Sequence, residues 1–170
     1  MNLLDLAGAS QANISFITNL GHRLYAADFL MVLDQTFGTD YAAQADPERM
    51  SPFLAQNLNF PAGHFDGALM WDTLQYVAPP LLEKVVARLA HILKPQSYLL
   101  SFFQSDEKPP MIPVYSYRIV DAKSLLLVPR GQRKPAQFFN NRGLERLFYQ
   151  FDSVKFFLTR DHLREVIVKR

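Results

Sequence analysis

The first 28 residues constrain the fold of this chain more than any other stretch. An apolar run, LLDL at 3–6, is followed by the small residues AGAS at 7–10. The apolar residues of 14–20 then recur at the spacing of one helix face, and a second apolar run, 24–27, ends at Asp28. Small residues let a backbone approach a ligand, a helix N-terminus offers unpaired N–H groups, and an acid can bind ribose hydroxyls. The stretch therefore has the plan of a nucleotide-binding β-α-β unit.

Two later stretches extend this pattern. FDGALM at 65–70 has the composition of a buried strand, and 81–100 contains a helix, a turn and a further strand. Together with DLAGA at 5–9 and DF at 28–29, they resemble the class I S-adenosylmethionine-dependent methyltransferases in order and spacing. The resemblance covers roughly residues 3–103.

This resemblance implies an α/β fold, a Rossmann-like three-layer αβα sandwich. Its sheet would hold seven mostly parallel strands in the order 3-2-1-4-5-7-6. We expect a weakly signalled third strand at 53–58 and a final antiparallel hairpin from 154–158 and 163–168. An additional β-hairpin is predicted near 114–128, and the chain is expected to form one domain, 1–170.

The resemblance also implies S-adenosylmethionine as the cofactor. The family binds it with the loop after the first strand, the acid after the second, the loop after the third and the end of the fourth. By position, the expected cofactor-binding residues are Asp5, Ala7, Gly8, Ala9, Asp28, Phe29, Gln56, Asn57, Met70 and Trp71.

No catalytic residue is assigned from the sequence. A sulfonium methyl is already activated, so a protein contributes mainly proximity and orientation, and a base matters only for weak nucleophiles. Asp72, Tyr76 and His64 are candidate bases near the sheet edge, and nothing in the sequence selects among them. The acceptor is expected to be a small molecule of unknown identity.

Two functions remain open at this stage. Ala7, Ala9 and Gln11 stand where the family usually carries glycines, and the helices that commonly precede the first strand are missing, which suggests a shortened start or a reduced domain. These departures favour a non-catalytic, methyltransferase-like binding or scaffold module, whereas Asp5 and Asp28 favour an enzyme.

Composition excludes several classes of protein. The chain is 49% hydrophobic and 20% charged, which is typical of a globular protein. It has no cysteine, so disulfides and thiolate catalysis are excluded, and its four histidines lack the spacing of metal ligands. No apolar run reaches membrane-spanning length and the start is not a signal peptide, so a cytoplasmic protein is expected.

Charge is distributed unevenly along the chain. Residues 1–107 carry five basic and eleven acidic side chains, a balance of −6, while 108–170 carry 13 and 5, a balance of +8. The basic stretch 130–134, close to the aromatic pair 138–139, leaves RNA binding open as a third and weaker hypothesis. The hairpin near 114–128 could wall a substrate site or pair with a second copy of the chain.

Overall fold

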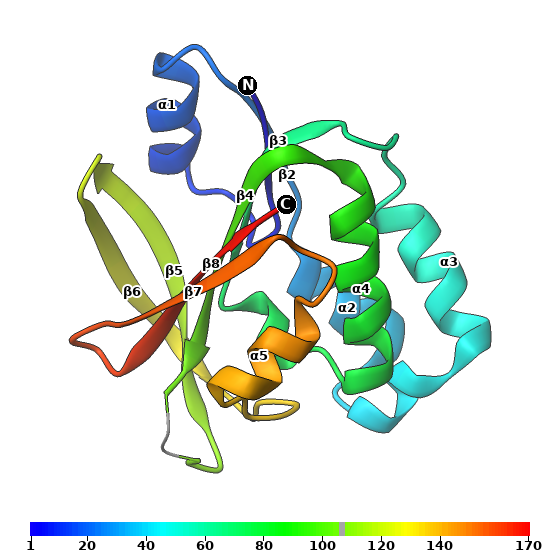
Figure 1. The fold of residues 1–170 in the computed structure, drawn as a ribbon. Helices are drawn as coiled ribbons and strands as arrows, with labels where there is room; N and C mark the ends of the chain where they lie inside the picture. The colour runs from blue at the N-terminus through cyan, green and yellow to red at the C-terminus, as the bar shows by residue number, and fades with distance from the viewer. Residues whose placement is uncertain (106–107) are drawn as a thin grey trace.

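The computed structural model describes residues 1–105 and 108–170, and its centre is a six-stranded sheet with helices and a hairpin on its faces (Figure 1). The elements, in chain order, are β1 (Asn2–Asp5), α1 (Gln11–Asn19), β2 (Arg23–Ala26), α2 (Phe29–Phe37), the 3-10 helix η1 (Tyr41–Ala45), α3 (Pro47–Asn57), β3 (Phe65–Trp71), the 3-10 helix η2 (Thr73–Tyr76), α4 (Pro79–Ile92), β4 (Leu93–Gln104), β5 (Ile112–Asp121), β6 (Ser124–Arg133), α5 (Asn141–Leu147), β7 (Ser153–Leu158) and β8 (Leu163–Lys169).

The sheet has the strand order β2-β1-β3-β4-β8-β7. β1 pairs in parallel with both β2 and β3, with Leu3 opposite Leu24 on one side and Gly67 on the other. β3 and β4 are also parallel, whereas β8 runs antiparallel to β4 and β7. The predicted α/β sandwich with a final antiparallel hairpin is therefore confirmed.

The predicted third strand at 53–58 is wrong. Most of this segment belongs to α3, which begins after Asp46, whose side chain accepts a hydrogen bond from the backbone N–H of Glu48. Met50 and Phe53, three residues apart, are both buried, as expected for one face of a helix. The sheet keeps the predicted order of its other strands and ends at β2.

Ending the sheet at β2 changes which face the next helices cover. The chain moves from β1 to β2 in one direction and then returns past β1 to β3 in the other. Right-handed crossovers in opposite directions lie on opposite faces of a sheet. As Figure 1 shows, α1 and the β5–β6 hairpin lie on one face, which we call the hairpin face, and α2, α3 and α4 lie on the other, which we call the helical face.

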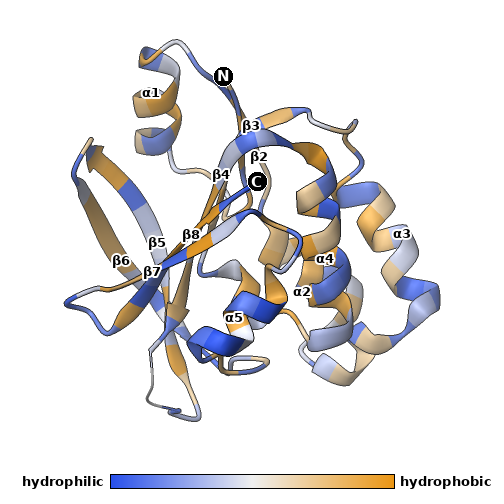
Figure 2. Cartoon of the chain, in the orientation of Figure 1, coloured by the Kyte–Doolittle hydropathy of each residue, from blue (hydrophilic) through white to orange (hydrophobic). Residues whose placement is uncertain are grey.

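The helical face carries the larger hydrophobic core. The helix predicted within 81–100 is confirmed as α4, and its Leu82, Val85, Val86 and Leu89 form one buried stripe, each at most 1% exposed. This stripe belongs to the same cluster as Ala68, Met70, Leu99 and Phe103 of the sheet and Leu144 and Phe148 at α5. Figure 2 shows the apolar residues of the central strands β4 and β8 running through the middle of the molecule.

The hairpin face is held by a smaller aromatic cluster. The Tyr117 ring of β5 stacks on Trp71 and Phe102, with centroid distances of 5.0 and 5.1 Å. The buried Asn13 of α1 donates its side-chain amide to the Tyr117 carbonyl at 2.9 Å and accepts from the Ile119 N–H at 2.7 Å. The predicted hairpin is thus confirmed, is longer than expected, and is fixed to both the sheet and α1.

None of the helices in the described ranges is long and apolar enough to cross a bilayer.

Candidate functional site

A cavity of about 990 Å³ lies beyond the carboxyl ends of β1, β2 and β3, the edge at which open α/β sheets bind ligands. One side, which we call the sheet wall, contains the loop after β1 and the start of α2. The opposite side, which we call the hairpin wall, comes from the base of the β5–β6 hairpin. The lining residues are Ala7, Asp28, Leu30, Met31, Asp34, Gln35, Thr39 and Tyr41 on the sheet side, Met111, Val114, Tyr115 and residues 130–134 on the hairpin side, and Asp72 between the two.

Asp5 shapes the loop after β1 from below. Its carboxylate is fully buried, and Oδ1 accepts hydrogen bonds from the Ala7 N–H and the Trp71 indole N–H, each at 3.0 Å. Burial raises the pKa of Asp5, and these two hydrogen bonds oppose that rise. Asp5 therefore positions the loop rather than lining the cavity.

Asp28, which lies between β2 and α2, places an acidic side chain in the cavity. Its Oδ1 accepts from the Met31 N–H at 3.0 Å and caps α2, while Oδ2 has no donor among the residues that the structure describes. Gly8, with φ +68°, passes so close that a Cβ there would lie 3.4 Å from Asp28 Oδ2. Glycine fits this position for two reasons: it tolerates the left-handed backbone, and it has no Cβ to crowd the Asp28 side chain.

Asp72 lies directly after β3, between the two walls. It is 2% exposed, and its Oδ2 accepts from the Tyr115 N–H at 3.4 Å. Burial raises the pKa of Asp72 to about 7, against the opposing effects of Tyr115, Arg130 and Arg133. A carboxyl group that titrates near neutral pH can take a proton from a bound molecule.

Arg133 joins the hairpin wall to the sheet wall. Its guanidinium donates to both carboxylate oxygens of Asp34 on α2, at 2.6 and 2.8 Å, and lies 5.2 Å above the Tyr76 ring. A bidentate pair of this kind has a fixed geometry. Arg133 is therefore engaged in holding the walls together.

The chain was compared with known proteins at the level of sequence and of structure. No protein-family model matches the sequence, and no curated protein matches it either. Solved structures do match, including a 1,6-didemethyltoxoflavin-N1-methyltransferase from Burkholderia thailandensis, crystallised with S-adenosylhomocysteine, at 17% identity and a TM-score of 0.54 over 99% of this chain and 70% of that one. An S-adenosylmethionine-dependent methyltransferase from Methanosarcina mazei matches at 15% identity and TM-score 0.55 over 99% and 92% of the two chains. The chain has the fold of the class I methyltransferases.

The methyltransferase fold brings two of the ten predicted cofactor residues into the cavity. All ten are described in the structure; Ala7 and Asp28 line the cavity, and the other eight do not. Gly8 and Ala9 lie in the loop after β1, and Gln56 and Asn57 lie at the end of α3. The other four are buried: Asp5, Phe29, Met70 and Trp71. Their contact with a cofactor stays a prediction.

The Gln11 side chain points away from the cavity. Of the three departures from the family pattern, it has the largest side chain and could most readily have filled this space. It is exposed on α1 and donates to the Ser15 hydroxyl at 3.3 Å. The cavity is therefore open at the position where this side chain could have blocked it.

The three candidate bases are now separated by position. Asp72 lines the cavity, whereas Tyr76 is fully buried beneath Arg133. His64 packs against Tyr25 and Phe65, with centroid distances of 5.3 and 4.7 Å, just before β3 and so at the opposite edge of the sheet. In the part of the chain that the structure describes, no cluster of side chains could hold a metal ion.

Sequence reasoning missed the face of α2 that lines the cavity. Met31 and Gln35 follow Asp28 by three and seven residues, the spacing of one helix face. That spacing could have identified them once Asp28 was placed at the start of the helix. The contact of Asp34 with Arg133 joins residues 99 positions apart and has no local signal.

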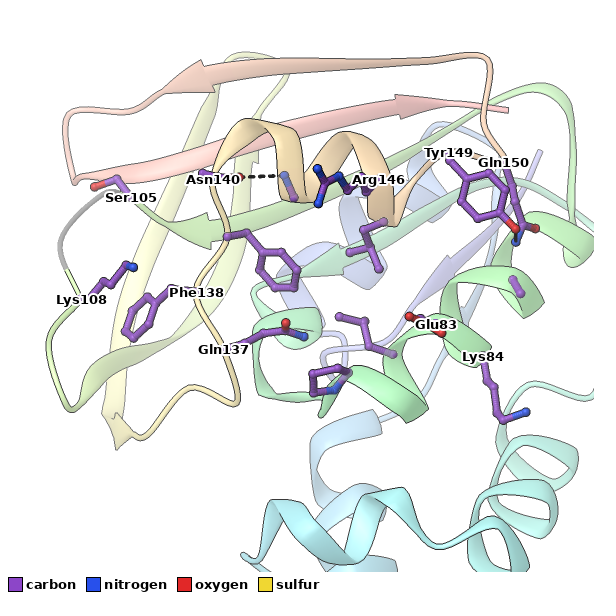
Figure 3. A pocket seen from close by; sticks show the side chains of 16 residues that line it. Glu83, Lys84, Ser105, Lys108, Gln137, Phe138, Asn140, Arg146, Tyr149 and Gln150 are labelled. Atoms are coloured by element: carbon purple, nitrogen blue, oxygen red, sulfur yellow. Dashed lines mark hydrogen bonds between the residues drawn. The ribbon is translucent and has the colours of Figure 1, made fainter.

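A second cavity, of about 670 Å³, lies between α4 and α5 on the helical face (Figure 3). Glu83 and Lys84 from α4 and Arg146 from α5 line it, together with Phe138 and Lys108. None of the ten predicted cofactor residues, all of which the structure describes, contributes to its lining. The cavity at the carboxyl ends of β1, β2 and β3 is therefore the candidate functional site.

Proposed function

We propose that this chain binds S-adenosylmethionine in the cavity between the sheet wall and the hairpin wall and transfers the methyl group to a small-molecule acceptor. The observation that carries the proposal is the position of Asp28. Within a methyltransferase fold, this acid follows β2 and caps α2, lines the cavity, and keeps Oδ2 without a donor among the described residues.

The residues of the sheet wall fit the parts of this cofactor. Asp28 Oδ2 would accept hydrogen bonds from the ribose hydroxyls, as the acid after the second strand does in nucleotide-binding folds. Leu30 and Met31 offer apolar surface to the adenine, and Met31 is 51% exposed. Ala7, in the loop after β1, lies against the same space. A cavity of about 990 Å³ is at the upper end of the range for ligand sites and leaves room for an acceptor.

The chemistry needs few groups from the protein. Bound S-adenosylmethionine would supply a sulfonium methyl group, whose carbon–sulfur bond breaks as the acceptor's lone pair forms the new bond to carbon, leaving S-adenosylhomocysteine. The chain's own contribution is to hold the acceptor in line and to receive its proton. Asp72 is the group in the cavity suited to that second task.

Calorimetric titration with S-adenosylmethionine and S-adenosylhomocysteine tests the proposal. Both should bind, and Asp28→Ser should weaken both at least tenfold, because a hydrogen bond to a charged group contributes about 1.5–3 kcal/mol. Serine retains the N-cap that Asp28 provides to α2, so the helix should remain stable. Asp46→Ser is the matched control, since Asp46 caps α3 and does not line the cavity. If neither compound binds, the proposal is contradicted.

A second candidate, a non-catalytic binding module, has one observation in its favour. Eight of the ten predicted cofactor residues do not line the cavity, although the structure describes all of them. The same titration separates the candidates, because a module that has lost its cofactor would bind neither compound at either pH 6 or pH 8.

A further inference from the structure

The hairpin wall also carries information about the methyl acceptor, and the inference that follows rests on the proposed function. Asp28 follows β2 and Asp72 follows β3, and these strands flank β1. Two strand spacings separate them, about 10 Å. If the ribose binds at Asp28, the acceptor occupies the space between Asp72 and the hairpin wall.

Three acids, Asp28, Asp34 and Asp72, and three cations, Arg130, Arg133 and Lys134, line the cavity, but they are not all paired with one another. Arg133 is neutralised by Asp34 through two hydrogen bonds. Arg130 and Lys134 line the same wall, are exposed, and make no ion pair with any described residue. Of the other two acids, Asp28 on the sheet side is assigned to the ribose under the proposed function, and Asp72 is largely buried. Two exposed cations without an ion pair to a described residue therefore remain at the hairpin wall, and they favour an anion beside them.

Apart from Gly131 and Gln132, the rest of the hairpin wall is apolar or aromatic. Met111, Val114 and Tyr115 line it, and Met111 is 44% exposed. The wall is anchored to the sheet, because Tyr117, two residues beyond Tyr115, packs against both Trp71 and Phe102. A fixed surface of this kind suits a compact apolar body rather than a chain that must be ordered on binding.

We propose that the methyl acceptor is a small molecule with a compact apolar body and an anionic group, a carboxylate or a phosphate, that binds Arg130 and Lys134. The apolar body lies against Met111, Val114 and Tyr115, and the nucleophile faces Asp72. Arginine matches both anions because its guanidinium can donate two parallel hydrogen bonds to either group.

Titration of the full chain saturated with S-adenosylhomocysteine tests this assignment. The probes are para-hydroxybenzoate, phenyl phosphate and the neutral para-hydroxybenzamide. At least one of the anions should bind ten or more times more tightly than the amide, and added salt should reduce that preference. Replacing both cations, by Arg130→Gln with Lys134→Gln, should abolish it. Arg118→Gln on β5, which is exposed and does not line the cavity, should leave it unchanged.

The outcomes distinguish this inference from the function on which it rests. If S-adenosylhomocysteine does not bind, both the proposed function and the inference are overturned. If it binds and the three probes bind equally, or none of them binds, the inference alone fails. A preference for anions that survives the double substitution would also overturn it, because the cations would then lie elsewhere. Binding of one anion without the other identifies the group that the site accepts.

Discussion

The two walls of the cavity are held in place by different means. The sheet wall continues from β1 and β2 into α2, and its residues rest on parallel pairing and on the large core of the helical face. The hairpin wall belongs to a separate two-stranded sheet. Its attachment depends on the stacked Tyr117, on the Asn13 amide and on the ion pair between Arg133 and Asp34.

This difference separates two tasks within one cavity. A wall built from the central sheet cannot change without disturbing the fold, whereas a hairpin fixed by a few side chains can change its lining alone. The proposed cofactor would thus bind to the invariable part of the architecture, and the acceptor would meet the variable part. Binding sites on loops and insertions supported by a rigid scaffold commonly divide in this way.

The largest expected effect comes from removing the Tyr117 ring, which packs against both Trp71 and Phe102. Tyr117→Ala should lower the free energy of unfolding by about 3–5 kcal/mol, as for other buried aromatic truncations. Amide exchange should accelerate in β5 and β6, while β1 and β3 stay protected. Tyr117→Phe is the control, because the Tyr117 hydroxyl is buried with no hydrogen-bond partner among the described residues, and its removal should cost less than about 1 kcal/mol. Equal loss of protection in β1 and β5 would show that the walls are not independent.

The next effect concerns Asp72, which lies between the walls. Below pH 7 its carboxyl is mainly neutral, and above pH 7 it is ionised, since its pKa is raised to about 7. An ionised carboxylate attracts the positive sulfonium, so S-adenosylmethionine should bind more tightly at pH 8.5 than at pH 5.5. The difference should be about tenfold, which corresponds to a lowering of the Asp72 pKa by roughly one unit when the sulfonium binds. S-adenosylhomocysteine has no sulfonium and should show no such change. Titrations at both pH values measure this, and Asp72→Asn should make the two compounds behave alike.

The smallest expected effect sharpens the description of the sheet wall. Gly8→Ala and Gly21→Ala both place a Cβ at positive φ, +68° and +79°, so each should cost about 1 kcal/mol of stability. At Gly8 the new carbon also meets the Asp28 side chain at 3.3 Å, whereas nothing lies within 4 Å at Gly21. Gly8→Ala should therefore weaken S-adenosylhomocysteine binding severalfold and Gly21→Ala should not. Identical affinities for the two variants would show that Asp28 does not contact the bound compound.

The sequence predicts the elements whose signals are local. The stripe of α4 repeats over four turns, and the alternation and turn of the β5–β6 hairpin lie within 22 residues, 112–133. Asp28 could be placed because a strand, its end and an acid follow one another directly. Each of these patterns is set by neighbours in the chain, so no tertiary contact is needed to read it.

The error at 53–58 has a physical cause. A short apolar run fits either a strand or one turn of a buried helix, and the family's pattern suggested a strand. The helix signal lay upstream, where Asp46 is the N-cap and Pro47 occupies the first helical position. The contacts that complete the site, such as those of Arg133 and Asp34, join distant segments and could not be predicted from either segment alone.

The ion pair between Arg133 and Asp34 has a consequence for the proposed methyl-transfer cycle. It ties one wall to the other, so any widening of the cavity must first separate the two charges. Both side chains are partly exposed, at 21% and 38%, and dissolved ions can weaken their attraction. Dissociation of S-adenosylhomocysteine should therefore become faster as ionic strength rises, because salt weakens the ion pair that holds the two walls together.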